Sequence, residues 1–239
     1  MKKYGILMKP DLAQQAHDGE KDVTRRLIPE QMKLWQKYAK HDNWIQNHDG
    51  RTWYTSHPNA STELLPRYPV GTVLAVRETH WRWGRHERNE KGNWRFVPQH
   101  AKMHGDEVIF SRPPYLCPAD RSTTGYHKRP GIHMLWDDAR TYVEIVGARP
   151  ERLHDITGAE TRREGVTFDA VMEILANYDT ADVRPYHWIH DGGDAAVAEE
   201  RVYRLGFAVL WDSINAARCP WSSNPWVWRY EYKRVSKPS

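Results

Sequence analysis

Near its C-terminus the chain reads Asn-Pro-Trp-Val-Trp-Arg-Tyr-Glu-Tyr-Lys-Arg-Val, residues 224–235. From Trp226 to Tyr232, aromatic side chains occupy every second position, and Val, Arg, Glu and Lys follow between and after them. Successive side chains of a β-strand point to opposite faces, so this alternation predicts a strand with one aromatic face. We expect that face to belong to the core rather than to serve as a platform for a ligand.

Three other segments have strand character. Within residues 71–83, Val73, Ala75 and Arg77 share one face and Leu74, Val76 and Glu78 share the other. This is the pattern of a strand with both faces largely covered. Residues 141–146 are β-branched and aromatic, and we expect the Arg149-Pro150 pair to interrupt that strand because proline cannot donate to a ladder. The apolar run at residues 4–8 predicts a short buried strand.

One helix start is signalled by a pair of polar residues. Thr157 and Glu160 have the spacing of a capping box, in which the hydroxyl and the carboxylate each satisfy a free backbone N–H. A helix of about two turns should therefore run to Glu164 and end at Gly165. Apolar spacing predicts further helices at residues 11–17, 29–46, 168–178 and 195–217.

The remaining segments are rich in turn formers. Residues 47–69 are expected to be loop, and a hairpin is expected at Glu90-Lys-Gly-Asn93. Short strands interleaved with a few helices predict an α+β or barrel architecture rather than a regular β-α-β series. The sequence contains no Gly-x-Gly-x-x-Gly and no Walker-type loop, which argues against a phosphate-cradling nucleotide fold.

Positive charge is concentrated in one part of the chain. The net charge is +4, while residues 81–130 hold ten Lys or Arg against five Asp or Glu. A local excess focuses the field and attracts polyanions. Twelve Trp and twelve Tyr against four Phe also favour a half-wet binding face. The competing interpretation is a solvated basic loop without a ligand.

Cysteine content and the first residues bear on localisation. Cys117 and Cys219 are too few for a disulfide framework, which favours the reduced cytosol. The apolar run at 4–8 is broken by Lys9 and Pro10, too short for a signal peptide or a membrane span. We expect a cytoplasmic protein that does not associate with membranes, and we predict no cofactor.

Four segments together resemble the ASCH-domain proteins of the PUA-like superfamily, in a longer form found in prophages. They are Gly19-Glu-Lys-Asp-Val-Thr-Arg-Arg26, Gly71-Thr-Val-Leu-Ala-Val-Arg-Glu78, residues 142–166, and Leu210–Asn215 with Asn224–Trp228. The resemblance implies an α+β fold built on a small PUA-like β-barrel with flanking helices. It also implies a single domain over residues 1–239, with long insertions at about 29–68 and 84–130.

The resemblance carries a candidate chemistry onto three residues. Some members of the family resemble amidohydrolases that deacylate N4-acylated cytidine, and their site residues match Lys21, Thr24 and Glu164 here. Such a reaction needs a hydroxyl nucleophile, a base and an acid. Lys21 can act as a base only if burial or neighbouring cations such as Arg25 and Arg26 lower its pKa. The adjacent carboxylate of Asp22 would have the opposite effect if it pointed inward.

A binding module is the main functional interpretation. PUA-like barrels hold RNA or a modified base in a cleft, and Lys21, Thr24, Arg25 and Arg26 would then hold a base or phosphate of a nucleoside or single-stranded nucleic acid, RNA ahead of DNA. In and directly after the segment at residues 71–78, aromatic and basic residues are interleaved, a pattern that suits stacking on an unpaired base. The candidate ligand-binding residues there are Arg77, Glu78, Trp81, Trp83 and Arg85.

Other interpretations stay open. Some ASCH proteins resemble ribonucleases, and a general base could come from five His residues: His80, His86, His100, His127 and His133. His187 and His190 lack further ligands nearby, so no metal site is predicted. A phage assembly role is also compatible with the resemblance. In a purely structural interpretation, Lys21 and Thr24 close a turn and Glu164 pairs with Arg162 or Arg163.

Overall fold

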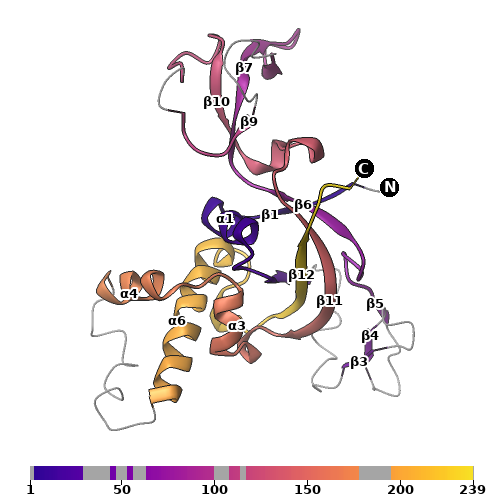
Figure 1. Ribbon diagram of the computed structural model, residues 1–239, viewed down its shortest axis with the longest axis vertical. Helices are drawn as coiled ribbons and strands as arrows, with labels where there is room; N and C mark the ends of the chain where they lie inside the picture. Colours follow the sequence, from indigo (N-terminus) through magenta and orange to yellow (C-terminus); the bar gives the residue numbers. More distant parts are fainter. Residues whose placement is uncertain are drawn as a thin grey trace. The chain divides into compact units, whose positions relative to one another are not determined.

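The computed structural model describes residues 3–28, 44–46, 53–55, 63–99, 108–113, 117–177 and 195–238. It divides into two compact units, each assembled from segments distant in sequence (Figure 1). Unit 1 consists of Met1–His17, Val73–Val143 and Val235–Ser239, and unit 2 of Asp18–Thr72 and Glu144–Arg234. The single domain predicted over residues 1–239 stays a prediction.

Unit 1 begins with a parallel strand pair. β1 (Tyr4–Leu7) lies beside β6 (Val73–Arg77), with Tyr4 opposite Leu74, and α1 (Pro10–Asp18) follows β1. Both strands were expected from their apolar runs. A small core cluster in this unit contains Ala75, Met134, Trp136, Ala139 and Tyr142.

A separate antiparallel sheet completes unit 1. Its strand order is β10-β7-β8, formed by β7 (His80–Arg88), β8 (Trp94–Pro98) and β10 (Gly125–Arg129). β9 (Val108–Ile109) also pairs with β7. The turn between β7 and β8 confirms the hairpin predicted at residues 90–93. Two 3-10 turns follow β10, η2 (Gly131–His133) and η3 (Trp136–Asp138).

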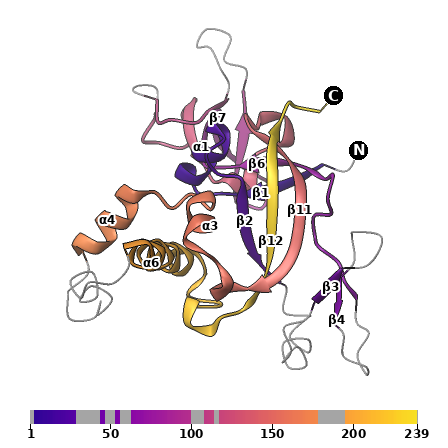
Figure 2. The same cartoon turned by 60° about the horizontal axis from the view of Figure 1, so that its bottom comes forward.

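The strands of unit 2 include the aromatic strand of the sequence. β12 (Trp226–Val235) lies between β11 (Tyr142–Arg152) and β2 (Val23–Leu27), and Figure 2 shows β11 and β12 side by side. β12 and β2 are antiparallel, with Thr24 opposite Tyr230 and Arg25 opposite Arg229. Trp226, Trp228, Tyr230 and Tyr232 are all buried, which confirms that the aromatic stripe belongs to the core.

Helices pack together in the same unit (Figure 2). They are α3 (Gly158–Arg163), α4 (Phe168–Asn177) and α6 (Ala195–Asn215), and turns η4 (Leu153–Asp155) and η5 (Trp221–Ser223) flank them. The apolar cluster of these elements contains Leu153, Ile156, Val166, Val171, Tyr203, Phe207, Trp211 and Val227. Gly206 in α6 allows close packing, because a Cβ there would lie 2.7 Å from the side chain of Val171.

The structure corrects three expectations. The described strands form open sheets and none closes into a barrel, because each sheet ends in a strand with one neighbour. Trp44–Gln46 is a strand, β3, rather than the end of a helix; it pairs with β4 (Trp53–Thr55), which pairs with β5 (Glu63–Leu64). Both short strands lie in the segment expected to be loop.

The third correction concerns β11, which continues through Arg149-Pro150 to Arg152 instead of stopping there. Proline removes one ladder donor but its φ fits an extended chain, so a strand can pass it where no hydrogen bond is required. The rest of the predicted helix at 29–46 lies outside the described residues. The mixed α+β class is confirmed. In the part of the chain that the structure describes, no helix has the length and apolarity needed to cross a membrane.

Candidate functional site

Lys21 and Glu164 meet, although 143 positions separate them in the sequence. Lys21 Nζ donates to Glu164 Oε2 at 2.8 Å, to the Glu164 carbonyl at 2.5 Å and to the Val23 carbonyl at 2.7 Å. An ammonium group has three donors, so this contact set uses all of them. Lys21 thus ties the start of β2 to the end of α3.

The capping box explains why Glu164 arrives at this point. The Thr157 hydroxyl accepts from the Glu160 N–H and the Glu160 carboxylate accepts from the Thr157 N–H, as the sequence predicted. The helix ends at Arg163, and Gly165 turns the chain with a positive φ of 95°, as a glycine that ends a helix commonly does. Glu164 is therefore held at the C-cap, where its backbone and side chain both face Lys21.

Thr24 lies on β2, three positions after Lys21, and its side chain is on the sheet face shared with Arg26 and Tyr230. Thr24 is 4% exposed, and Lys21 and Glu164 are 2% and 4% exposed. The three predicted groups lie in one region, but packed side chains cover them, in contrast to the open cleft expected from the sequence.

The opposite face of β2 carries a buried ion network. Arg25 contacts Glu151 at 2.6 Å, Glu160 at 2.8 Å and Glu164 at 3.1 Å, and its side chain is fully buried. Arg229, directly across on β12, contacts Glu160 at 2.8 Å. Three cations, Lys21, Arg25 and Arg229, are thereby balanced by three carboxylates. Each buried charge is paired, as burial requires.

Sequence reasoning missed three members of this network, Glu151, Glu160 and Arg229. Glu160 was assigned only to a helix cap, and Glu151 follows the Pro150 expected to end its strand. The available signal was the alternation on residues 226–235, which places Arg229 on the same face as Glu231. Finding its partner requires the β2–β12 register, which one sequence does not contain.

The Asp22 carboxylate pairs with Arg163 rather than with Lys21. Its two carboxylate oxygens accept from Arg163 at 2.8 and 2.9 Å, in a bidentate pair that is partly exposed. Arg162 contacts Glu199 instead. Neither arginine pairs with Glu164, so that part of the purely structural interpretation is wrong.

Burial lowers the pKa of Lys21 below its ordinary value; Glu164 opposes this shift, while Arg26 and Arg25 add to it. The direction agrees with the expectation that neighbouring cations make Lys21 easier to deprotonate. Burial raises the pKa of Tyr232, and the charge of Glu164 adds to the effect. The Tyr232 hydroxyl is buried and has no hydrogen-bond partner among the described residues.

The predicted ligand residues of unit 1 are engaged within that unit. Glu78 is 1% exposed and accepts from Arg140 at 2.8 and 3.0 Å. Trp83 packs edge-on against Tyr126, with ring centroids 5.0 Å apart, and Arg85 pairs with Glu87 at 2.7 Å.

Two further predicted residues of unit 1 are also partly covered. Arg77 packs so close to Gly5 that a Cβ there would lie 2.3 Å from its Nε, and Trp81 is half-buried. Trp81 and Trp83, the two aromatic residues of this set, are each partly exposed.

The His residues of the nuclease interpretation do not form one constellation. His80 is fully buried and its Nδ1 lies 3.2 Å from the Glu78 carbonyl. His86 and His127 pack edge-on at 5.0 Å, and His100 lies outside the described residues. His187 and His190 are also outside them. In the described ranges, no group of three or more His, Cys, Asp or Glu residues is placed to hold a metal ion.

Comparison with known proteins adds no relative to this description. Neither the scan against protein-family models nor the searches of curated proteins and solved structures finds a match for the chain.

Proposed function

We propose that the protein is a PUA-like protein of the ASCH type and that it holds a nucleoside on the β2–β12 face of unit 2, beside Lys21, Thr24 and Glu164. The observation that carries the proposal is the contact between the Lys21 ammonium and the Glu164 carboxylate at 2.8 Å. The family resemblance selects these two residues from sequence motifs alone, and their meeting is what a shared site requires.

The Tyr232 hydroxyl supports a polar ligand at this place. A buried hydroxyl without a partner costs about 1–3 kcal/mol, and such groups are uncommon in folded proteins. The charges of Glu164 and Arg26 act on this hydroxyl, so it belongs to the same region. A nucleoside could satisfy it with a base carbonyl or a ribose hydroxyl. Tyr68 and Tyr230, whose ring centroids lie 5.5 Å apart, are buried beside it and would provide apolar ring surface once uncovered.

Entry of a nucleoside requires local opening, because Lys21, Thr24 and Glu164 are covered. Glu164 contacts both Lys21 and Arg25, so the opening has to uncover Lys21 and Glu164 while those two contacts are kept. Arg25 then holds the fold, and Thr24 and Arg26, on the other face of β2, lie beside the ligand.

Titration calorimetry with cytidine and N4-acetylcytidine tests the proposal. Tyr232→Phe should weaken binding by roughly 0.5–1.5 kcal/mol, the net value of one hydrogen bond, without reducing protein stability. The matched control is Tyr142→Phe in unit 1, where the hydroxyl donates to the Trp136 carbonyl at 2.6 Å. That variant should lose stability and keep its affinity. Equal affinity of the wild type, Tyr232→Phe and Lys21→Met proteins would refute the nucleoside site.

Deacylation of an N4-acylcytidine is the second candidate function, favoured by the lowered pKa of Lys21 and by its contact with Glu164. Once Lys21 has passed a proton to Glu164, its amine can accept the Thr24 proton as the hydroxyl oxygen attacks the amide carbon. The C–N bond then breaks as Glu164 returns its proton to the departing cytidine amine, and water hydrolyses the Thr24 ester to free Thr24 and the carboxylic acid. Chromatography of the released cytidine tests this, and Thr24→Val must abolish it.

A further inference from the structure

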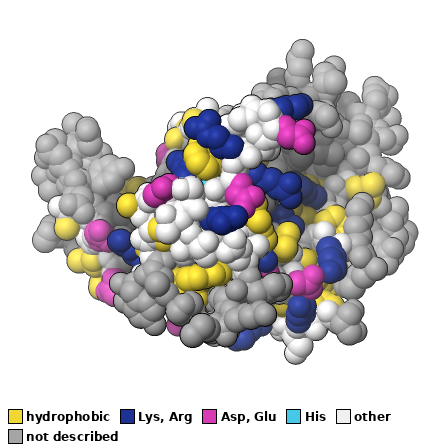
Figure 3. Space-filling view, turned by 90° about the horizontal axis from the view of Figure 1, so that it is seen from above, with side chains coloured by type: hydrophobic (Ala, Val, Ile, Leu, Met, Phe, Trp, Pro, Cys, Tyr) yellow, Lys and Arg dark blue, Asp and Glu magenta, His cyan; other side chains and the backbone are white. Residues whose placement is uncertain are grey.

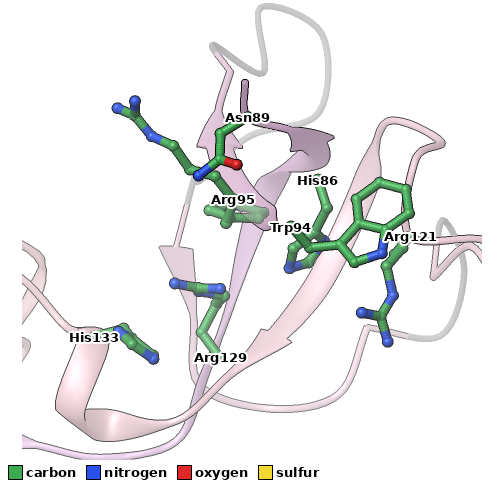
Figure 4. A pocket seen from close by; sticks show the side chains of 8 residues that line it. His86, Asn89, Trp94, Arg95, Arg121, Arg129 and His133 are labelled. Carbon is green, nitrogen blue, oxygen red and sulfur yellow. The ribbon is translucent and has the colours of Figure 1, made fainter. Parts of the chain in front are cut away.

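Unit 1 contains a hollow of about 490 Å³ on the β10-β7-β8 sheet (Figure 4). Its apolar lining is Trp94 and Phe96 on β8. Its basic lining comes from Arg95, Arg121 and Arg129, joined by His86 and His133. Figure 4 shows the Trp94 indole beside Arg121, with Arg129 and His133 elsewhere around the same space. The volume is within the range of small-ligand sites.

Strand register explains why His86, Trp94 and Phe96 lie on one face of the sheet. His86 lies opposite Phe96 across the β7–β8 ladder, and Arg88 lies opposite Trp94. Side chains directly opposite in an antiparallel pair are on the same face. The β7 positions 81, 83 and 85 therefore point to the other face. Trp81, Trp83 and Arg85, the residues predicted from the sequence, therefore lie on the face of β7 that does not carry the hollow.

Arg121 and Arg129 have aromatic partners rather than carboxylates. The Arg129 guanidinium lies 4.5 Å from the Phe96 ring centroid, and Arg121 lies 5.7 Å from that of Trp94. Neither arginine forms an ion pair with any residue that the structure describes. The nearby carboxylate of Asp120 is directed to Ser122, whose N–H and hydroxyl donate to it at 2.9 and 2.7 Å.

The electrostatic environment of the hollow is positive. Burial lowers the pKa of His86, and His127, Arg129 and Arg121 lower it further. Burial and the charge of Arg82 lower the pKa of Arg129. His86 Nδ1 is buried and has no hydrogen-bond partner among the described residues. Figure 3 shows Lys and Arg side chains exposed next to apolar ones on one face of the molecule.

We propose that this hollow binds single-stranded nucleic acid, with a backbone phosphate held by Arg121 and Arg129 and an unpaired base stacked on Trp94. Arginine matches a phosphate with several donors in a fixed plane, and the positive field draws a polyanion toward it. Trp94 is 42% exposed, and the guanidinium groups of Arg88 and Arg121 lie over its ring at 4.9 and 5.7 Å from the centroid, so a base stacks there by displacing one of them. A duplex keeps its bases stacked on each other, which is why a single strand fits. The site lies in unit 1 and goes beyond the nucleoside site proposed for unit 2.

Fluorescence anisotropy with a labelled strand of about 12 nucleotides tests the proposal on the full chain. Trp94→Ala should weaken binding about tenfold, and Trp94→Phe should retain most of it, because stacking on one aromatic ring has that order of value. Trp94 is exposed, so both variants should unfold at the wild-type temperature. Unchanged affinity of Trp94→Ala would overturn the stacking assignment.

The phosphate contacts are tested by salt dependence. Arg121→Ala and Arg129→Ala should each reduce the slope of log affinity against log salt by about 0.7. The matched control is Lys128→Ala, which removes the same charge one position away on β10 but on the opposite face. A slope equally reduced in the Lys128 variant would mean diffuse attraction and would overturn the hollow as the site.

Five competitors identify the ligand class. An unlabelled strand should compete best, a duplex and an abasic strand of equal length should compete at least tenfold less well, and a mononucleotide should compete only weakly. Equal competition by the abasic strand or by heparin would refute base stacking. If the wild type fails to bind nucleosides yet binds the strand, only the unit 2 proposal is lost.

Discussion

In unit 2, Arg25 touches three carboxylates and is fully buried, whereas in unit 1 Arg129 lies over the ring of Phe96 with no carboxylate partner among the described residues. In unit 2 the charge of Arg25 is already neutralised by carboxylates of the protein, without a ligand. The arrangement in unit 1 leaves a positive potential at the surface of a hollow. Buried pairing fixes a fold but leaves little field for recognition, while unpaired cations next to aromatic rings favour a polyanion. The two regions therefore predict different responses to mutation, acid and salt.

Removing Arg25 should have the largest effect on stability. Arg25→Ala leaves the carboxylates of Glu151, Glu160 and Glu164 without their shared cation, which should lower the free energy of unfolding by about 3–5 kcal/mol. Urea denaturation measures the loss. The control is Arg162→Ala, whose exposed pair with Glu199 should be worth no more than about 1 kcal/mol. Equal losses in the two variants would remove the distinction between buried and exposed charge in unit 2.

Reversing one charge in the hollow should affect binding and leave the fold unchanged. Arg129→Glu places a carboxylate where a phosphate is proposed to lie, so strand affinity should fall by at least about tenfold. The melting temperature should stay close to the wild-type value, because Arg129 forms no ion pair with a residue that the structure describes. A large loss of stability in this variant would show that Arg129 has a structural role like that of Arg25.

Acid should tighten strand binding through His86. In the free protein, burial, His127, Arg129 and Arg121 lower the pKa of His86. A bound phosphate favours the charged form and raises this pKa, so the complex takes up a proton. Affinity should therefore be highest below the pKa of the free protein and decline as pH rises through that of the complex. His86→Gln should flatten the profile measured by anisotropy, and an unchanged profile would exclude His86 as its source.

The smallest effect is expected at Asp22. Its bidentate pair with Arg163 is partly exposed, so Asp22→Asn should cost at most about 1 kcal/mol in urea denaturation. The Lys21–Glu164 pair should be unaffected, because Asp22 is directed to Arg163. A loss comparable to that of Arg25→Ala would show that Asp22 belongs to the buried network.

Elements with local signals were predicted well. The alternation at 226–235 and the capping box at Thr157 depend on residues a few positions apart, and both are present in the structure. The hairpin at residues 90–93 was also correct. By contrast, β11 continues through Pro150, because a strand tolerates proline where no ladder donor is needed. Such tolerance depends on the neighbouring strand and is invisible in a local pattern.

The candidate sites show the same limit. The meeting of Lys21 with Glu164 came from a family resemblance, whereas Arg229 and Glu151 needed strand register to be placed against Arg25. In unit 1, Trp81 and Trp83 were preferred over Trp94, although all three are aromatic residues within one basic segment. A shift of one residue changes the face of a strand, and the β7–β8 register alone decides which face carries the hollow.

Glu160 connects two events that are usually separate in folding. Its carboxylate accepts from the Thr157 N–H at the start of α3 and also contacts Arg25 and Arg229 on neighbouring strands. The Glu160 carboxylate therefore links the first turn of α3 to the β2–β12 ladder. Amide protons at the beginning of this helix and along that ladder should exchange with solvent together, as one cooperative unit that opens as a whole.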